Sequence, residues 1–468
     1  MRKIIILIAI AIAAGCAVGP HYVPPQVAIP PAYKEQNSPA ASQLQPAQPL
    51  DQTSRDAWWQ VFGDQALSDL EVRLIGANPA LAEAEARFRQ ARAIVEEERA
   101  EYFPVVTAAT SAARTRAASD SRGDLSTGTS TAYALRADVS WEADLWGRIR
   151  QTVASGTASA QAAAGDVASA RLSLGAELAA DYFELRSANA ELALFDETIE
   201  AYERAATLTR NQYNAGIVSR ADVEQADTQL ASAEAQAVDV RLQRAQLEHA
   251  IAVLVGEPPA NLSLPAVPLA GEPPVVPADV PSRLLQRRPD IGAAERRIAA
   301  ANAQIGVASA AFFPALTLTG DAGFQATHLQ QWLAWPMRFW SVGPALALTV
   351  FDAGARRSVK AQAVAGYDAT VAIYRETVLS AIQDVEDNLA AEKLLKDEAE
   401  RQQAATAAAQ RSLDIAMNQY RAGIVSYLQV ETQQTALLTS QRAALGVSER
   451  RYVAALQLIR ALGGGWPP

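Results

Sequence analysis

Side chains that commonly perform catalysis or bind metal ions are few in this sequence. It has one cysteine, Cys16, and its three histidines, His21, His249 and His328, stand in three different parts of the chain. A zinc site needs about four such ligands, usually closely spaced. The sequence also has no glycine-rich phosphate loop and no nucleophile motif. It therefore predicts a protein that is not an enzyme and that holds no metal or other diffusible cofactor.

The thiol of Cys16 stands in a setting that has a chemistry of its own. Two basic residues precede an apolar run at 4–14, and a glycine comes directly before the cysteine. This pattern is typical of a secretory signal peptide, and the run is too short to span a bilayer as a helix. The segment resembles the bacterial lipoprotein signal, although residue 13 is Ala where that motif more often has Leu. The resemblance implies a signal peptide at 1–15 and a covalent lipid on Cys16; the alternative is an ordinary signal peptide with a coincidental cysteine.

The overall composition argues against two broad classes of protein. Hydrophobic residues make up 50% and charged residues 20% of the chain, which is not the composition of a disordered protein. The 41 Lys and Arg residues against 51 Asp and Glu residues give a net charge of −10. This charge argues against nucleic acid as a partner.

A two-fold internal repeat organises the chain. The sequence Tyr213–Ser219 (YNAGIVS) returns as Tyr420–Ser426 (YRAGIVS), 207 residues later, and Pro79 returns as Pro289. Prolines gather in 20–50 and 257–281, which we interpret as extended segments, because proline cannot continue a helix or a central strand. We therefore divide the chain into six segments. These are 1–15, signal peptide; 16–63, lipid-anchored extended segment; 64–256, first repeat; 257–281, linker; 282–462, second repeat; and 463–468, tail.

Each repeat is expected to contain a helix, two strands and a long helical hairpin. The helices are predicted at 79–101 and 289–310, and the hairpins at 148–255 and 355–462. Apolar residues alternate with polar ones in the strand regions, as they do along Tyr133–Trp141, Leu316–Phe324 and Trp340–Val350. Trp332, Trp335, Phe339 and Trp340 lie near one strand connection, as aromatic residues do at a bilayer interface. A soluble sandwich with one wet face would alternate in the same way.

The returning arms of the hairpins carry a seven-residue repeat. The series Val223, Leu230, Ala237, Arg244, Ile251 has a counterpart in Val430, Leu437, Ala444, Arg451, Leu458. This spacing predicts coiled-coil packing between long helices, and both series place arginine at the same step. An outgoing arm of roughly 65 residues would be about 95 Å long, too long to be buried inside a globular domain.

Four strands in one chain cannot close a membrane barrel, because the smallest have about eight. After the signal peptide, no apolar run reaches the roughly 18 residues that a spanning helix needs, so a crossing would require a closed β-barrel. Two copies would give eight strands and three would give twelve, with room for a lumen. We therefore expect a mixed α and β, mostly helical fold, in which several chains share a β-barrel that long helices continue.

The chain resembles the outer-membrane factors of tripartite efflux systems, the TolC-like and OprM-like proteins, particularly their lipoprotein branch. The resemblance covers residues 16–462 and is carried by Cys16, Trp141–Arg148 (WEADLWGR), Phe351–Gly354 (FDAG) and the two Tyr-x-x-Gly turns. It implies a homotrimeric outer-membrane channel with a long periplasmic α-helical barrel. It also implies two protein partners, a periplasmic adaptor and a proton-driven inner-membrane pump. The channel would be a passive exit duct for small molecules and drugs.

The family places acidic residues just after the second hairpin tip, where they line a constriction. The matching positions here are Gln429 and Thr432, which are uncharged. We therefore predict a pore constriction that includes Asp222, Glu224 and Glu431, with outward-facing tip charges as the alternative. In the family, matching tyrosines hydrogen-bond across helices in the closed state, which implies this role for Tyr213 and Tyr420; simple packing is the alternative.

The hairpin tips present the same apolar turn twice. We expect the adaptor to dock there, on Gly216, Ile217, Val218, Ser219, Gly423, Ile424, Val425 and Ser426. Two other functions stay open at this point. The duct could serve type I protein secretion, or the chain could be a lipid-anchored coiled-coil scaffold without a pore.

Overall fold

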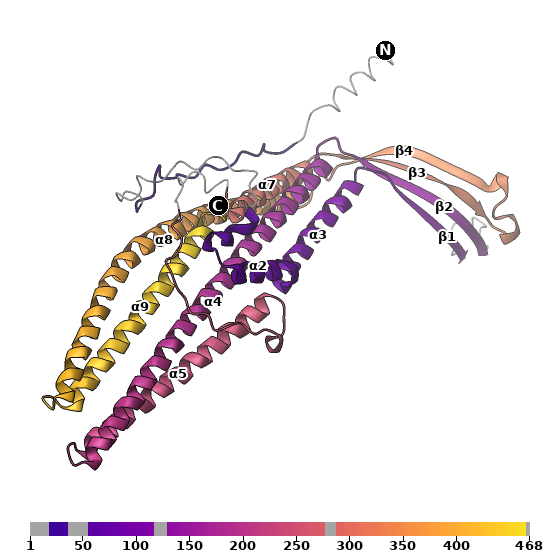
Figure 1. Cartoon of the computed structure of the whole chain (residues 1–468). Helices are drawn as coiled ribbons and strands as arrows, with labels where there is room; N and C mark the ends of the chain where they lie inside the picture. The colour runs from indigo at the N-terminus through magenta and orange to yellow at the C-terminus, as the bar shows by residue number, and fades with distance from the viewer. Residues whose placement is uncertain (1–17, 36–54, 117–128, 277–286, 465–468) are drawn as a thin grey trace. The chain divides into compact units, whose positions relative to one another are not determined.

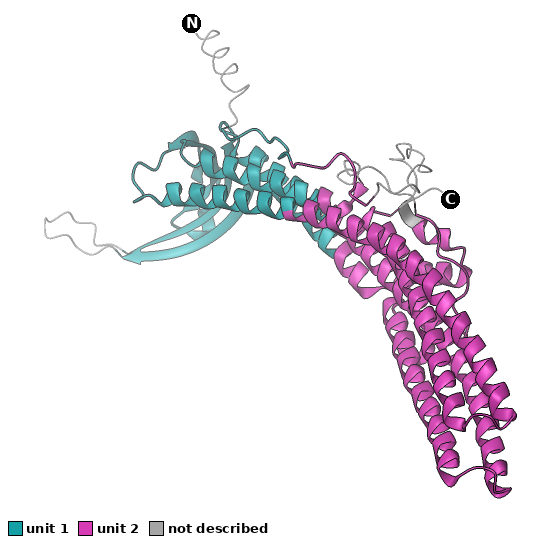
Figure 2. Ribbon diagram, turned by 90° about the vertical axis from the view of Figure 1, so that its left-hand side faces the viewer, with its two compact units in different colours: residues 1–26, 86–164, 293–375 teal, residues 27–85, 165–292, 376–468 magenta. Residues whose placement is uncertain are grey.

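The computed structural model describes residues 18–35, 55–116, 129–276 and 287–464, which belong to two compact units (Figures 1 and 2). Unit 1 comprises 1–26, 86–164 and 293–375, and unit 2 comprises 27–85, 165–292 and 376–468. Each unit takes residues from both sequence repeats. The repeat boundaries therefore describe similarity along the chain rather than these units, and they stay a prediction.

Unit 1 contains one antiparallel sheet with the strand order β1-β2-β3-β4. The strands are β1 (Val105–Arg116), β2 (Thr129–Ala143), β3 (Ala315–Ala326) and β4 (Arg338–Ala347). The expectation of two strands in each repeat is confirmed. The expectation that the last strand reaches Val350 is wrong. Ala347 pairs with Ala315, the first residue of β3. The residue before Ala315 is Pro314, which has no N–H with which to extend the ladder.

Neither face of this sheet is covered by the described part of the chain. All 12 residues of β1 are exposed, and Ala134 and Ala326 are the buried residues of β2 and β3. The outer strands β1 and β4 each have one neighbour in the sheet, so each leaves one edge free in the single chain. A sheet with two exposed faces and two free edges buries too little apolar surface to be stable alone.

Seven α-helices account for most of the described residues. Each repeat has a 67-residue outgoing helix, α4 (Arg148–Asn214) or α8 (Ala355–Arg421), and a 35-residue return helix, α5 (Arg220–Leu254) or α9 (Tyr427–Ala461). The helices α3 (Pro79–Ala100) and α7 (Pro289–Ala310) both begin at the predicted proline, and α2 (Gln65–Ala77) was not predicted. The expected mostly helical architecture is thus confirmed. No helix in the described ranges combines the length and apolarity needed to cross a membrane.

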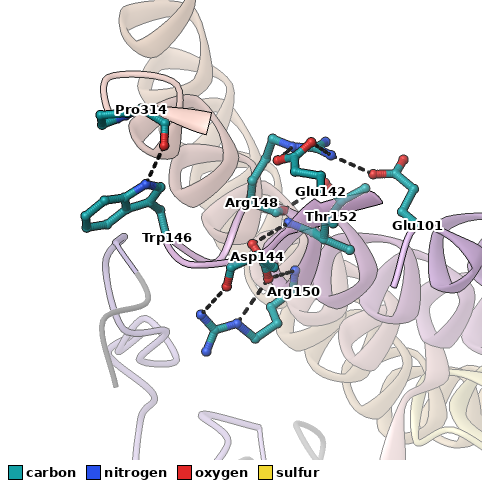
Figure 3. A network of polar contacts seen from close by, with 9 residues as sticks. Glu101, Glu142, Asp144, Trp146, Arg148, Arg150, Thr152 and Pro314 are labelled. Carbon is teal, nitrogen blue, oxygen red and sulfur yellow. Dashed lines mark hydrogen bonds and ion pairs between the residues drawn. The ribbon is translucent and has the colours of Figure 1, made fainter. Parts of the chain in front are cut away.

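A network of charges fixes the start of α4 just after β2 (Figure 3). The guanidinium of Arg148 donates to both oxygens of Glu142, at 2.9 Å each, and to Glu101 at 2.9 Å. These carboxylates, Glu142 first, raise the pKa of Arg148. Asp144 accepts the backbone N–H of Arg150 at 2.9 Å and its Nε at 3.1 Å. Charge-assisted hydrogen bonds of this kind are the stronger ones in proteins, so the junction sets the direction in which α4 leaves the sheet.

The core of unit 2 gathers side chains from most of its segments. It includes Tyr33, Trp58, Leu67, Leu74, Phe183, Ile251, Val276, Leu456 and Ile459. Tyr33 comes from the first proline-rich segment and Val276 from the second, and both are buried. These two segments therefore pack against the helices as structured parts of the unit, where the sequence had suggested linkers alone.

One carboxylic acid lies within this core. Glu71 on α2 is 1% exposed, and its Oε1 has no hydrogen-bond partner among the described residues. Burial disfavours the charged form, and it raises the pKa of Glu71 from 4.5 to about 8 despite the attraction of Arg171. The folded state therefore holds the proton more tightly than the unfolded chain does.

This shift predicts that the contribution of Glu71 to stability falls as the pH rises. The stabilising contribution of the protonated Glu71 is complete below about pH 4.5 and is lost as the pH rises to about 8, at up to about 1.4 kcal/mol per pH unit. The variant Glu71→Gln should therefore melt at a higher temperature than the wild type at pH 8.5 and show no gain at pH 4.5. Thermal melting across this range measures the effect, with Asp69→Asn, an exposed change on the same helix, as control. Parallel profiles for Glu71→Gln and the wild type would contradict it.

Candidate functional site

The two hairpin tips in unit 2 have the same backbone geometry. Gly216 and Gly423 have φ values of 74° and 73°, in the left-handed region that side chains with a Cβ rarely adopt. The N–H of Gly216 donates to the carbonyl oxygen of Tyr213 at 2.8 Å, and that of Gly423 to Tyr420 at 2.9 Å. These bonds close the ends of α4 and α8 in the manner of a glycine C-cap. The repeated sequence thus forms the same turn twice.

Asp222 and Glu224, two of the predicted constriction residues, have local partners at the first tip. Asp222 and Ser219 form a capping box: the Ser219 N–H donates to Asp222 Oδ2 at 2.9 Å, and the Asp222 N–H donates to Ser219 Oγ at 3.3 Å. Glu224 pairs with Arg220 at 3.2 Å, and both side chains are more than half exposed. The structure therefore gives Asp222 a helix-starting role and Glu224 a solvated ion pair worth little free energy.

Tyr213 and Tyr420, the two tyrosines predicted to hydrogen-bond across helices, lie in different surroundings. Tyr213 is 42% exposed, whereas Tyr420 is 6% exposed. The hydroxyl of Tyr420 donates to Gln212 Oε1 at 2.5 Å, so it joins α8 to α4. Its ring meets that of Tyr427 edge-on at 5.7 Å between centroids. Of these two tyrosines, only Tyr420 is thus placed to hold the two hairpins together.

Glu431, the third predicted acidic residue, also joins the hairpins. Its Oε1 accepts a hydrogen bond of 2.7 Å from Gln225 on α5, and its Oε2 is buried with no hydrogen-bond partner in the described ranges. The nearby Tyr427 hydroxyl is also buried with no hydrogen-bond partner in the described ranges. Burial, followed by the charge of Glu431, raises the pKa of Tyr427, so the phenol stays neutral and can donate a hydrogen bond.

Three hydrogen bonds join α5 and α9 in one constant register. Besides Gln225 and Glu431, the Nε2 of Gln229 donates to Thr435 Oγ1 at 3.0 Å, and Arg442 donates to Gln236 Oε1 at 3.0 Å. Each pair is separated by 206 residues. We call these three pairs the rungs. They lie along the seam where the equivalent return helices of the two repeats meet, on the tip side of unit 2.

The structure brings together part of the predicted site. Tyr420 and Glu431 lie near Tyr427 beside a small buried cluster, whereas Tyr213, Asp222 and Glu224 lie apart from it on more exposed parts of the tips. The glutamines Gln212, Gln225, Gln229 and Gln236 were missed. Their only signal in the sequence is the seven-residue spacing of Gln229 and Gln236, which does not distinguish a contact between hairpins from a solvated face. Cys16 lies outside the described residues.

Comparison with known proteins gives a consistent result over the whole chain. The model of the family described as "Outer membrane efflux protein" matches residues 72–257 and 280–464. The toluene efflux pump outer membrane protein TtgC of Pseudomonas putida is 32% identical over 470 residues, covering 100% of this chain and 96% of its own. The outer membrane protein OprJ of Pseudomonas aeruginosa is 31% identical over 98% of this chain and 95% of its own.

Solved structures agree with the sequence comparisons. The outer-membrane channel OprN superposes with a TM-score of 0.87 at 31% identity, covering 97% of this chain and all of that one. The family model matches both repeats, and the relatives match from end to end. The chain belongs to the outer membrane efflux protein family.

Proposed function

We propose that this protein is the passive exit duct of a tripartite pump, gated at its periplasmic hairpin tips. The observation that carries the proposal is a sheet with two uncovered faces and two free edges, attached to helices far too long for a globular core. Lipid on one face and water on the other account for both exposed faces. The duct performs no chemistry of its own, and the pump supplies the energy.

Three identical copies close the sheet in this proposal. The free edge of β1 in one copy pairs with the free edge of β4 in the next, which gives twelve strands and leaves no backbone group unpaired in the bilayer. Exposed apolar side chains on the helices, among them Val238, Leu242, Ile373, Leu379 and Leu394, supply surface for contacts between copies. A lipid on Cys16 would add an anchor in the outer membrane.

The tips are the proposed contact with the periplasmic adaptor. Ile217 and Ile424 are 71% and 72% exposed at the two turns, and their equivalence offers the adaptor the same apolar contact twice. A proton-driven pump in the inner membrane would deliver the substrates. One relative is named for toluene efflux, and we propose small apolar and amphipathic molecules, drugs included, as the substrates here.

The proposal is tested by reconstituting the mature protein in planar bilayers and by deleting its gene. We expect discrete conductance steps from the trimer, and accumulation of lipophilic drugs in the deletion strain. Absence of any conductance would favour the coiled-coil scaffold instead. Conductance with normal drug efflux, but with loss of a secreted protein from the medium, would favour the duct of a type I secretion system.

A further inference from the structure

The segment that joins the two repeats is bound along unit 2. We call residues 262–276 the strap. Leu262 and Val276 are buried in the core at its two ends, and Leu264 and Leu269 pack partly buried against that core. Residues 265–268, between these two leucines, are exposed. The leucines of the strap therefore pack on the helices, while the backbone oxygens of Val267 and Pro268 accept hydrogen bonds from Asn189 and Arg186 of α4.

Arg244 on α5 fixes the strap at its first anchor. Its guanidinium binds three acceptors: Asn189 Oδ1 at 2.8 Å, Glu248 Oε2 at 3.1 Å and the backbone oxygen of Leu264 at 2.7 Å. Glu248 in turn accepts the N–H of Leu264 at 2.6 Å. Both backbone groups of one strap residue thus bind charged partners, which makes strong and directional hydrogen bonds.

Arg451 on α9 fixes the strap at its second anchor. Its guanidinium is ion-paired with Glu272, and the hydroxyl of the adjacent Tyr452 donates to the backbone oxygen of Ala270 at 3.0 Å. The hydrogen bond from Arg451 lowers the pKa of Glu272, so the pair stays charged at neutral pH. Arg244 and Arg451 are 207 residues apart, the offset of the repeat. Equivalent arginines of the two repeats therefore hold one continuous peptide.

The rungs lie between these anchors and the tips. Arg244 follows the first residue of α5 by 24 residues (220 to 244), and Arg451 follows the first residue of α9 by 24 (427 to 451). Both anchors are thus about 36 Å along the helix from the tip end. A slip of α5 past α9 by a single residue, about 1.5 Å, would displace the two partners of every rung along the seam and weaken its hydrogen bond.

We propose that the strap sets the register of α5 against α9 and thereby holds the gate at the tips closed, with Arg244 and Arg451 as its positioning residues. The inference rests on the proposed duct, since only a duct has a gate. When the strap is released, the two return helices keep the rungs and the apolar clusters that they share, but lose the peptide that binds to both of them. The tips then sample the open arrangement more often.

The test is made on the mature protein reconstituted in planar bilayers. In the double variant Arg244→Gln with Arg451→Gln, the ratio of open to closed time at fixed voltage should rise about fivefold or more. The matched control is Arg241→Gln with Arg450→Gln, which removes the same charge from neighbouring arginines. These pair with Asp196 and Glu398 and do not touch the strap.

A second variant avoids the risk that the double substitution disturbs folding. A protease site inserted after the exposed Ala266 is cut once the channel is reconstituted, and cutting should produce the same rise in open time. Unchanged opening in both variants, or a lower melting temperature without any change in opening, overturns the role of the strap. A wild-type protein that gives no conductance at all refutes the duct instead.

Discussion

Replacing Gly216 and Gly423 together by valine should abolish efflux while the protein still assembles in the outer membrane. Both glycines have φ values above 70°, where a β-branched residue is strongly disfavoured. Beyond the two neighbouring residues, no described atom lies within 4 Å of the position that a Cβ would take at either glycine, so the effect would come from the backbone and not from a clash. The turn must adopt another shape, which moves the exposed Ile217 and Ile424 away from the adaptor.

Drug susceptibility of a deletion strain carrying the variant measures this effect. Susceptibility should match that of the empty deletion strain, with trimer and membrane levels equal to the wild type. The control is Gly446→Val, a glycine within α9 that has ordinary helical φ and open space around it. Full drug resistance in the double-valine strain would mean that the adaptor does not bind the hairpin tips.

The hairpins could be predicted from the sequence because their determinants are local. The repeated Tyr-x-Ala-Gly-Ile-Val-Ser specifies one turn twice, and the seven-residue series needs only neighbouring turns of the same helix. The long helices agree with the predicted ranges to within about one residue, if the hairpin turns are set aside. Three of the four strands were found by alternation, but the end of β4 depends on Pro314, the residue before β3, which no local pattern in β4 contains.

The charges of the gate could not be assigned in this way, because their roles depend on the partner helix. Glu224 and Glu431 occupy equivalent positions in the two repeats. Glu224 has Arg220 one turn earlier and pairs with it, whereas the equivalent residue before Glu431 is Tyr427. Without a cation one turn earlier on α9, Glu431 binds Gln225 on α5. One arginine-to-tyrosine difference between the repeats therefore separates an ion pair within one helix from a link between the hairpins.

The strap shows the same limit. Its prolines predicted an extended segment, and the extended backbone is present up to residue 276. What the sequence did not reveal is that arginines from both repeats bind this segment, Arg244 at a backbone oxygen and Arg451 at the carboxylate of Glu272, since these contacts join residues that lie 20 and 179 positions apart. The sequence shows Arg244 and Arg451 at the same position of the two seven-residue series, but coiled-coil packing gave no reason for an arginine there.

Removing the hydroxyl of Tyr420 should have the second large effect, and Tyr213, its equivalent in the first repeat, provides the control. Tyr420→Phe removes the hydroxyl that donates to Gln212, leaving a polar atom without its partner between α4 and α8. The loss of this partly buried hydrogen bond costs about 0.5–1.5 kcal/mol, which corresponds to a roughly 2- to 13-fold shift toward the open state if all of it falls on the closed state. Tyr213→Phe changes the equivalent but exposed residue and should leave the gate unaffected.

Leakage through the outer membrane distinguishes the two tyrosine variants. Cells with Tyr420→Phe should take up a large hydrophilic antibiotic that the intact membrane excludes, and cells with Tyr213→Phe should resist it like the wild type. Because phenylalanine keeps the ring that packs on Tyr427, the Tyr420 variant tests the hydroxyl and not the packing. Equal leakage from both variants would mean that the exposed hydroxyl of Tyr213 holds the channel closed as much as the hydroxyl of Tyr420 does. Leakage from neither would leave Glu431 and the rungs as the links that hold the hairpins together.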